Sequence, residues 1–209
     1  MSFVRKSCHE KKAGFCLSVF CVFLVSLSAA DDPKTLKFTD DQIGWTVSYP
    51  AYMSRLSDEE IAEIENTGEE LMEDAAGGEI EKNHRNLLYL KKGETSSFTS
   101  ASEPFDEEID GPYSETQEAL YDLIVQAYEG TGLPVEHERG EAMIDGLTFQ
   151  TLTVRLFAPE KKQVLVTQIA YDRLMGGKES VMISINWHDE EDRELLEKIV
   201  QSSKFSIRD

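Results

Sequence analysis

Apolar and polar residues alternate along several stretches of the chain in a way that predicts β-strands. Residues 36–38 and 45–49 alternate with a period of two, which predicts two strands joined by a turn over residues 40–44. Pro50 has no amide proton to donate and should end the second strand. Further segments with strand character are residues 87–90, 96–102, 142–144, 147–157, 163–171 and 181–187. Along 181–187, Val181, Ile183, Ile185 and Trp187 share one face.

A different spacing, in steps of three and four residues, predicts a first helix after Ser57. Ser57 and Glu60 form a capping box, in which the hydroxyl and the carboxylate satisfy free amides at the helix start. Gly68 interrupts this helix and costs about 1 kcal/mol relative to alanine, so we expect either close packing or a break there. The stripe expected to be buried is Ile61, Ile64, Gly68, Leu71 and Ala75.

Two more helices are predicted later in the chain. Ser114 and Gln117 match a second capping box, and Gly130 and Gly132 should end that helix. The third helix opens with four acids at 189–192, where the helix dipole favours negative charge. Its expected buried face is Leu195, Leu196, Ile199 and Val200, and the second helix should bury Leu120, Leu123, Ile124, Ala127 and Tyr128. Phe205 and Ile207 could form a short final strand.

The order of these elements predicts a fold class. Asp145 and Gly146 favour a tight primed turn, and most other strand connections are also short enough for hairpins. Hairpins join antiparallel strands. We therefore expect an α+β domain with a mostly antiparallel sheet of about six to eight strands and helices packed on its faces.

This order resembles the PsbP-like family, which includes photosynthetic extrinsic proteins, a Ran-binding relative and many bacterial exported proteins. Residues 44–50, Gly-Trp-Thr-Val-Ser-Tyr-Pro, are similar to the family's opening strand, which closes in Tyr-Pro. Residues 147–187 match its antiparallel run, and residues 190–205 its closing helix and short Ser-Phe strand. The family has no universal catalytic residues, so the resemblance implies a binding or assembly module rather than an enzyme.

The first thirty residues have the pattern of a secretory signal. Arg5, Lys6, Lys11 and Lys12 precede a nearly continuous apolar run over residues 15–27, and residues 28–30 are small. The run is about 13 residues long, shorter than the roughly 20 needed to cross a bilayer as a helix. We expect cleavage near Ala30, with an uncleaved anchor as the alternative, and a single domain over residues 31–209 in the periplasm or outside the cell. No stable membrane insertion is expected after cleavage.

The composition of residues 31–209 excludes several classes of function. The chain carries a net charge of −19; residues 1–30 contribute +3 and residues 31–209 contribute −22. Such a charge repels phosphates and headgroups, which argues against nucleic-acid binding through a basic face. All three cysteines lie within the first 21 residues, so residues 31–209 hold no thiol nucleophile, disulfide or cysteine metal ligand.

The acids are concentrated in two stretches. Eleven acids and no base lie between Arg55 and Lys82, and twelve acids and no base between Lys92 and Arg139. Two of the predicted helices fall in these stretches, so we expect acidic helical faces. These faces could dock a basic protein partner or divalent cations, and a surface that serves solubility alone is the simpler interpretation.

Recognised catalytic and cofactor motifs are absent from the sequence, so we predict no catalytic residue, no metal ligand and no cofactor. There is no Gly-x-Ser-x-Gly or Ser-x-x-Lys pattern, and the glycines at 176 and 177 make too short a loop for a phosphate site. A metal-dependent or hydrolytic enzyme is an alternative, and it would require His188 and at least two carboxylates to converge. A small-ligand binder is another, with a pocket between sheet and helix lined by Trp45, Tyr49 or Trp187; filling of the core is the simpler role of these aromatics.

Two sequence patterns bear weakly on metal binding, one for calcium and one for zinc. Asp106, Glu108, Asp110 and Gly111 resemble the start of a calcium loop, but its twelfth position holds Gln117 instead of glutamate. We interpret this segment as an acidic surface loop before a capped helix. His84, His137 and His188 lie far apart in the sequence and lack the pair spacing of a zinc site, so surface or capping roles are expected for each.

Overall fold

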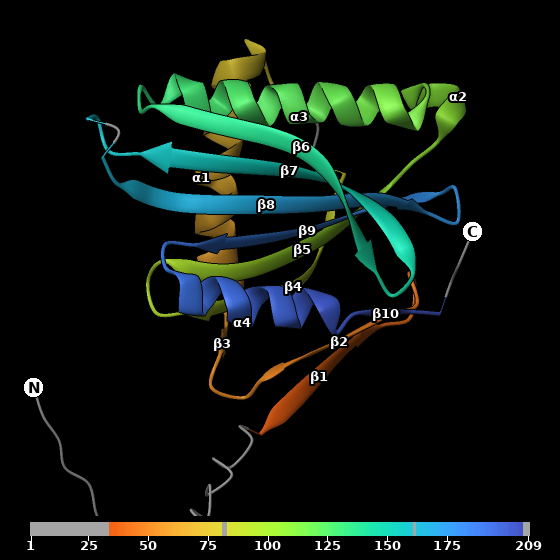
Figure 1. The fold of residues 1–209 in the computed structure, drawn as a ribbon. Coiled ribbons are helices and arrows are strands. Elements are labelled where there is room, and N and C mark those ends of the chain that lie inside the picture. Colours follow the sequence, from red (N-terminus) through yellow and green to blue (C-terminus); the bar gives the residue numbers. More distant parts are fainter. Residues whose placement is uncertain (1–33, 81–82, 161, 207–209) are drawn as a thin grey trace, which may run out of the picture. The chain divides into compact units, whose positions relative to one another are not determined.

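The computed structural model describes residues 34–80, 83–160 and 162–206, and Figure 1 shows the course of the chain. The expected leader, residues 1–30, lies outside the described residues, as does Ile207. The first two strands, β1 (Thr35–Asp40) and β2 (Trp45–Pro50), pair antiparallel across the predicted turn. The last strand, β10 (Lys204–Phe205), pairs with the other edge of β2 to make a three-stranded sheet.

The second sheet has seven strands in the order β3-β4-β5-β9-β8-β7-β6, and every neighbouring pair in it is antiparallel. Its strands are β3 (Ser54–Arg55), β4 (Arg85–Lys92), β5 (Ser96–Pro104), β6 (Val135–Ile144), β7 (Leu147–Phe157), β8 (Val164–Met175) and β9 (Glu179–Trp187). The turn from β6 to β7 has positive φ at both Asp145 (50°) and Gly146 (77°), the conformation that a type I′ turn requires. The α+β fold with a mostly antiparallel sheet is therefore confirmed.

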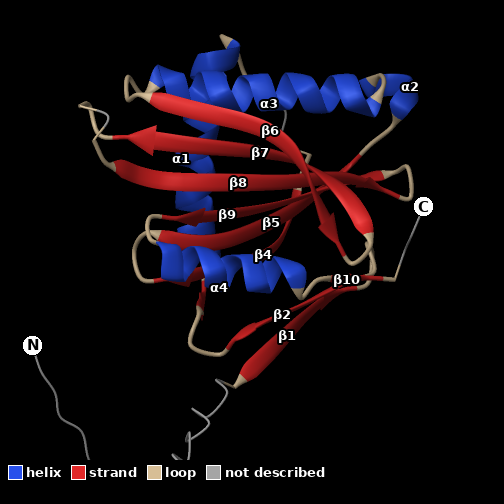
Figure 2. Cartoon of the chain, in the orientation of Figure 1, coloured by secondary structure: helices blue, strands red, loops and turns tan. Residues whose placement is uncertain are grey.

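Four helices accompany the two sheets in the described part of the chain. They are α1 (Asp58–Ala76), α2 (Glu107–Asp110), α3 (Tyr113–Gly130) and α4 (Glu190–Gln201). Figure 2 shows α4 in front of the seven-stranded sheet and α1 behind it, with α3 along its upper part. None of the helices in the described ranges is both long enough and apolar enough to cross a membrane.

The main hydrophobic core lies between the larger sheet, the three-stranded sheet and α4. Trp45 is fully buried at its centre and stacks on Phe98 of β5 and Phe205 of β10, with ring centroids 6.3 and 6.4 Å apart. Tyr49 and Trp187 are also buried in this cluster. The three aromatic residues considered as pocket walls therefore fill the core. Leu196, Ile199 and Val200 of α4 pack there too, as their spacing predicts.

A smaller core lies on the opposite face, between α3 and strand β7. Tyr121 and Val125 of α3 pack against Leu152, Val154 and Leu156 of β7. Helix α3 also buries Gln117 and Ala127, and it ends at Gly130 as expected. The prediction of its buried face is largely wrong, because Ala127 is buried but Leu120, Leu123, Ile124 and Tyr128 are only partly buried.

Helix α1 begins as the sequence predicts, but the prediction of its buried stripe is wrong. The hydroxyl of Ser57 accepts from the Glu60 amide, and the Glu60 carboxylate accepts from the Ser57 amide at 2.8 Å. No residue of α1 is buried, and Ile64 and Leu71 are 48% and 38% exposed. The helix runs through Gly68 without a break, and a Cβ built there would meet nothing within 4 Å, so close packing does not explain this glycine.

The second predicted capping box, at Ser114 and Gln117, is also wrong. Helix α3 begins at Tyr113, and its N-cap is Pro112, which offers no side-chain hydrogen bond. The helix therefore begins two residues before the position that a Ser114 cap would require. Gln117 turns inward to a buried carboxylate instead of back to the helix end.

Candidate functional site

A polar cavity of about 630 Å³ lies between the first half of α3 and strands β7 and β8. Gln150 of β7 and Asp172 of β8 are cross-strand partners, so their side chains share the sheet face that α3 covers. We call this cavity the Asp172 pocket. Its lining includes Tyr113, Gln117 and Glu118 of α3, Thr148 and Gln150 of β7, and Asp172 of β8.

Asp172 is the most buried residue of this lining, with 1% of its surface exposed. Gln117 Nε2 donates to its Oδ2 at 2.9 Å, and Ser180 Oγ donates to its Oδ1 at 3.1 Å. Burial raises the pKa of Asp172 above the usual value, against hydrogen bonds from Tyr113, Gln117 and Ser180 that lower it. A carboxylate held by donors from α3 and β9 ties these elements together, and it leaves a negative group next to the cavity.

Two tyrosines of α3 lie near this carboxylate. Burial raises the pKa of Tyr121 and of Tyr113, and the charge of Asp172 raises both further. The Tyr113 hydroxyl lies 3.4 Å from Ser180 Oγ. The Tyr121 hydroxyl is buried and has no hydrogen-bond partner among the described residues. Both phenols therefore stay protonated at neutral pH, and they can act as hydrogen-bond donors but not as bases.

The sequence analysis missed this site, although two signals were present. Asp172 occupies an inward position of a long, otherwise largely apolar strand, where aspartate is disfavoured. Gln117 lies four residues before Tyr121, on the inward stripe of α3. A polar residue on each of two buried faces predicts that the two meet, because buried polar groups need partners. The pairing of these faces was not evident from the sequence.

The predicted acidic helical faces are present on α1 and α3, which pack against each other. Helix α1 holds nine acids and α3 holds four, and neither helix has a basic residue. Together with α2, which adds three acids, we call this the acidic layer. Two of its ion pairs, Glu60 with Lys91 and Asp122 with Arg139, are made with bases of the sheet at 2.5 Å, and Glu65 lies 3.1 Å from His84.

Most of the other acids of this layer extend into solvent. Glu63 and Glu70 of α1 and Glu115 and Glu129 of α3 are exposed. Within the described ranges, none of these four forms an ion pair. At these four positions the layer thus presents negative charge that the described part of the protein does not neutralise.

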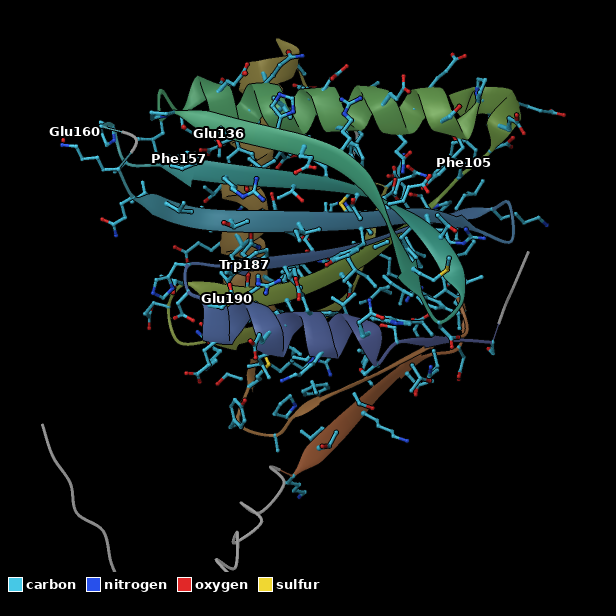
Figure 3. The ribbon with its side chains drawn as sticks, in the orientation of Figure 1. Phe105, Glu136, Phe157, Glu160, Trp187 and Glu190 are labelled. Carbon is cyan, nitrogen blue, oxygen red and sulfur yellow. The ribbon has the colours of Figure 1, made fainter. Side chains whose placement is uncertain are left out.

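The expected calcium-like segment is part of this layer and forms the short helix α2. Asp106 Oδ1 accepts from the Glu108 amide at 3.0 Å, and Asp110 Oδ2 accepts from the Asp106 amide at 2.8 Å. These carboxylates cap the turn, so the segment is an acidic surface helix and not the loop that was expected, and the helix that follows has no side-chain cap. Phe105, labelled in Figure 3, lies just before α2 and packs edge-on against Tyr113, with ring centroids 5.2 Å apart.

The three histidines are exposed and have different neighbours. His84 Nε2 lies 3.1 Å from Glu65 of α1, His137 belongs to the edge strand β6, and His188 Nδ1 lies 3.0 Å from Thr95. His188 lies in the connection between β9 and α4. Figure 3 labels the two ends of this connection, Trp187 and Glu190.

His188 does converge with two carboxylates, those of Asp189 and Asp192, with potential ligand atoms within 4.8 Å of one another. However, Lys92 Nζ contacts Asp192 Oδ1 at 2.5 Å, and Ser96 donates to the other oxygen. Asp189 Oδ1 caps α4 by accepting from the Asp192 amide. An ammonium already neutralises Asp192, so the arrangement stabilises the helix start and is poorly suited to a second cation.

A smaller cavity of about 210 Å³ lies between sheet and helices, as the small-ligand alternative requires. Its lining differs from the predicted aromatic residues. Gly68 and Met72 of α1, Ile124 of α3, Ala170 of β8 and Met182 of β9 contribute to it. Leu71 of α1 also lines this cavity, so the partly exposed stripe of α1 forms one of its walls.

Comparisons with known proteins agree with this architecture. No family model matches the sequence, and no curated protein matches it either. Among solved structures, the chain is similar to cyanobacterial PsbP (CyanoP) from Synechocystis sp. PCC 6803, with a TM-score of 0.51 and 12% identity over 87% of this chain and 98% of that one. At this identity the likeness concerns the fold alone. The resemblance drawn from the sequence is confirmed at that level, and the chain has a PsbP-like fold.

Proposed function

We propose that the protein is an exported, non-enzymatic binding module that docks a basic protein partner on its acidic layer. The observation that carries the proposal is the charge of two packed helices, α1 and α3, which together lack any basic residue. A surface of one sign steers an oppositely charged partner and favours it over acidic or neutral ones.

The state of the buried carboxylates supports a non-enzymatic role. Asp172 accepts hydrogen bonds from Gln117 and Ser180, and Asp192 is held by Lys92 and Ser96. Each carboxylate is engaged by neighbours that fix helices to the sheet. Both carboxylates therefore have a role in holding the fold together.

The direct test compares two charge variants by calorimetry with an octa-arginine peptide. In the layer variant, Glu63, Glu70, Glu115 and Glu129 are changed to glutamine. In the control variant, Asp41 is changed to asparagine and Glu94, Glu191 and Glu194 to glutamine. These control acids are equally exposed but lie on turns and on α4. Both variants change the net charge by the same amount.

We expect the layer variant to lose about tenfold in affinity, which corresponds to about 1.4 kcal/mol, and the control variant to change by less than about twofold. The wild-type affinity should fall as the salt concentration rises, because screening weakens exposed charges. Equal losses in the two variants would show that total charge alone attracts the peptide, and the docking proposal would then be abandoned.

A further inference from the structure

The Asp172 pocket opens within the acidic layer, beside the start of α3. Glu118 belongs to the exposed face of α3 and also lines the pocket. A second hollow, lined by Phe105 and by residues of α2 such as Glu107 and Asp110, adjoins it and shares Gly177 with it. A partner that covers the acidic layer at this end would therefore also cover the mouth of the pocket.

The lining offers chemistry that suits a cation. Glu118 and Asp172 contribute carboxylates, and Gln117 and Gln150 contribute amide oxygens. The lining also includes Tyr113, whose aromatic ring could receive a flat cation. A guanidinium is planar, with a fork of N–H donors that matches a carboxylate, and it stacks on aromatic rings.

The charges that face Asp172 decide the sign of the ligand. From α3 the charged group of the lining is Glu118, and from β8 it is Arg173, whose Nη1 donates to the Thr148 carbonyl at 2.8 Å and so forms part of the wall. With Asp172 ionised, two carboxylates face one engaged guanidinium and the lining is negative; burial raises the pKa of Asp172, so this excess charge develops as the pH rises. An anionic ligand would meet this excess charge, whereas a cation would reduce it.

A buried hydroxyl near Asp172 belongs to Tyr121, which is not one of the residues that line the pocket. Tyr121 is 3% exposed, and its hydroxyl has no hydrogen-bond partner among the described residues. Buried polar groups are rarely left unsatisfied in native proteins. The described part of the protein thus leaves one hydrogen-bonding group near Asp172 unused.

We propose that the Asp172 pocket receives an arginine side chain of the basic partner and so anchors that partner at the start of α3. This inference rests on the proposed docking function. The guanidinium would donate to Glu118 and to the amide oxygens of Gln117 or Gln150, with the Tyr113 ring against its plane, and it would approach the charge of Asp172.

The test uses N-acetyl-arginine amide as the probe and follows backbone and side-chain NMR signals. The pocket variant is Glu118→Gln, and the matched control is Glu129→Gln, which makes the same charge change on the same helix outside the pocket. Both residues are exposed, so neither change threatens folding. We expect probe-induced shifts at Tyr113, Gln117 and Gln150, an affinity loss of about five- to tenfold for Glu118→Gln, and less than about twofold for Glu129→Gln.

The octa-arginine titrations of the layer variant and its control, compared with the probe titrations of the two single variants, separate the two proposals. If the layer variant still binds the peptide more weakly than its charge control, but Glu118→Gln and Glu129→Gln behave alike with the probe, docking holds and the pocket inference is wrong. If the layer variant and its control are equal, docking fails. A probe that still bound the pocket in that case would mark a site for a free guanidinium compound, and the anchoring role proposed here would be overturned.

Discussion

Gln117 of α3 donates a hydrogen bond of 2.9 Å to Asp172 of β8, a residue 55 positions later in the chain. This hydrogen bond holds the first half of α3 against strand β8 of the larger sheet. It also explains why a buried aspartate is tolerated in a central strand, since buried charges persist when they are hydrogen-bonded.

Replacement of Asp172 by asparagine should change how stability depends on pH. Burial raises the pKa of Asp172 in the folded protein above 3.8, so the folded state holds the proton more tightly than the unfolded chain. This contribution is fully present below about pH 3.8 and is lost as the pH rises through the folded pKa. Asparagine cannot titrate. The unfolding free energy of the variant relative to wild type should therefore increase as the pH rises from about 4 to 7.

Urea titrations at a series of pH values measure this difference. Asp41→Asn, which removes a carboxylate from an exposed turn, is the control, and the pH-dependent change for Asp172→Asn should exceed that of the control. A constant difference for Asp172→Asn would mean that Asp172 titrates alike in the folded and unfolded states.

The sequence predicted the elements far better than it predicted the site. Alternation in residues 181–187 and the Asp145-Gly146 turn act locally, so the strands and the type I′ hairpin could be recognised without knowledge of the fold. The pairing of Gln117 with Asp172 depends on which helix face meets which strand, and no local pattern carries that information. For the same reason Gln117 was assigned to a helix cap when its actual partner lies on another element.

The expected burial of Ile64 and Leu71 failed for a related reason. Spacing identifies an apolar stripe, but the amount of it that is buried depends on how closely the helix approaches the sheet. Helix α1 packs mainly against α3 and leaves a cavity toward the strands, so this stripe stays partly exposed. Helix α4, with similar spacing, lies directly on β9 and buries Leu196 and Val200.

Asp192→Asn should destabilise the protein at neutral pH by about 2 kcal/mol, because Lys92 would lose its charged partner beside a largely buried position. Burial opposes ionisation of Asp192, but hydrogen bonds from Lys92 and Ser96 lower its pKa below the usual value. A lowered pKa gives stability that is present above about pH 3.8 and is lost as the pH falls through the folded pKa. The destabilisation measured by urea titration should therefore shrink on acidification.

Glu191→Gln provides the control for this pair. Glu191 lies 3.4 Å from the same Lys92 ammonium, but its side chain is 90% exposed. Exposed ion pairs contribute little, so we expect a change within about 0.5 kcal/mol. Similar losses of unfolding free energy in Asp192→Asn and Glu191→Gln would indicate that any negative charge near Lys92 stabilises the protein equally, whether its contact is buried or exposed.

Gly68→Ala should stabilise the protein by about 1 kcal/mol, because alanine restricts the unfolded chain and favours the helix while the added Cβ meets no atom within 4 Å. Gly77→Ala should have the opposite sign. Gly77 caps the same helix with φ of 71°, a conformation in which a side chain is strained. Thermal unfolding followed by circular dichroism distinguishes the two. A loss of stability in Gly68→Ala would mean that α1 bends or packs closely at this position.

Trp45→Ala should be the most damaging single change among those considered, with a loss of about 3–5 kcal/mol. Trp45 lies between Phe98 of the larger sheet and Phe205 of the smaller one, so its removal leaves a cavity at the junction of the two sheets. The indole N–H has no partner among the described residues, so the loss comes from packing and not from a broken hydrogen bond. Tyr52→Ala, at a residue 55% exposed, should change the unfolding free energy by less than about 0.5 kcal/mol. If urea titration gave comparable losses for the two variants, the two sheets would not share the core that the Trp45 stack defines.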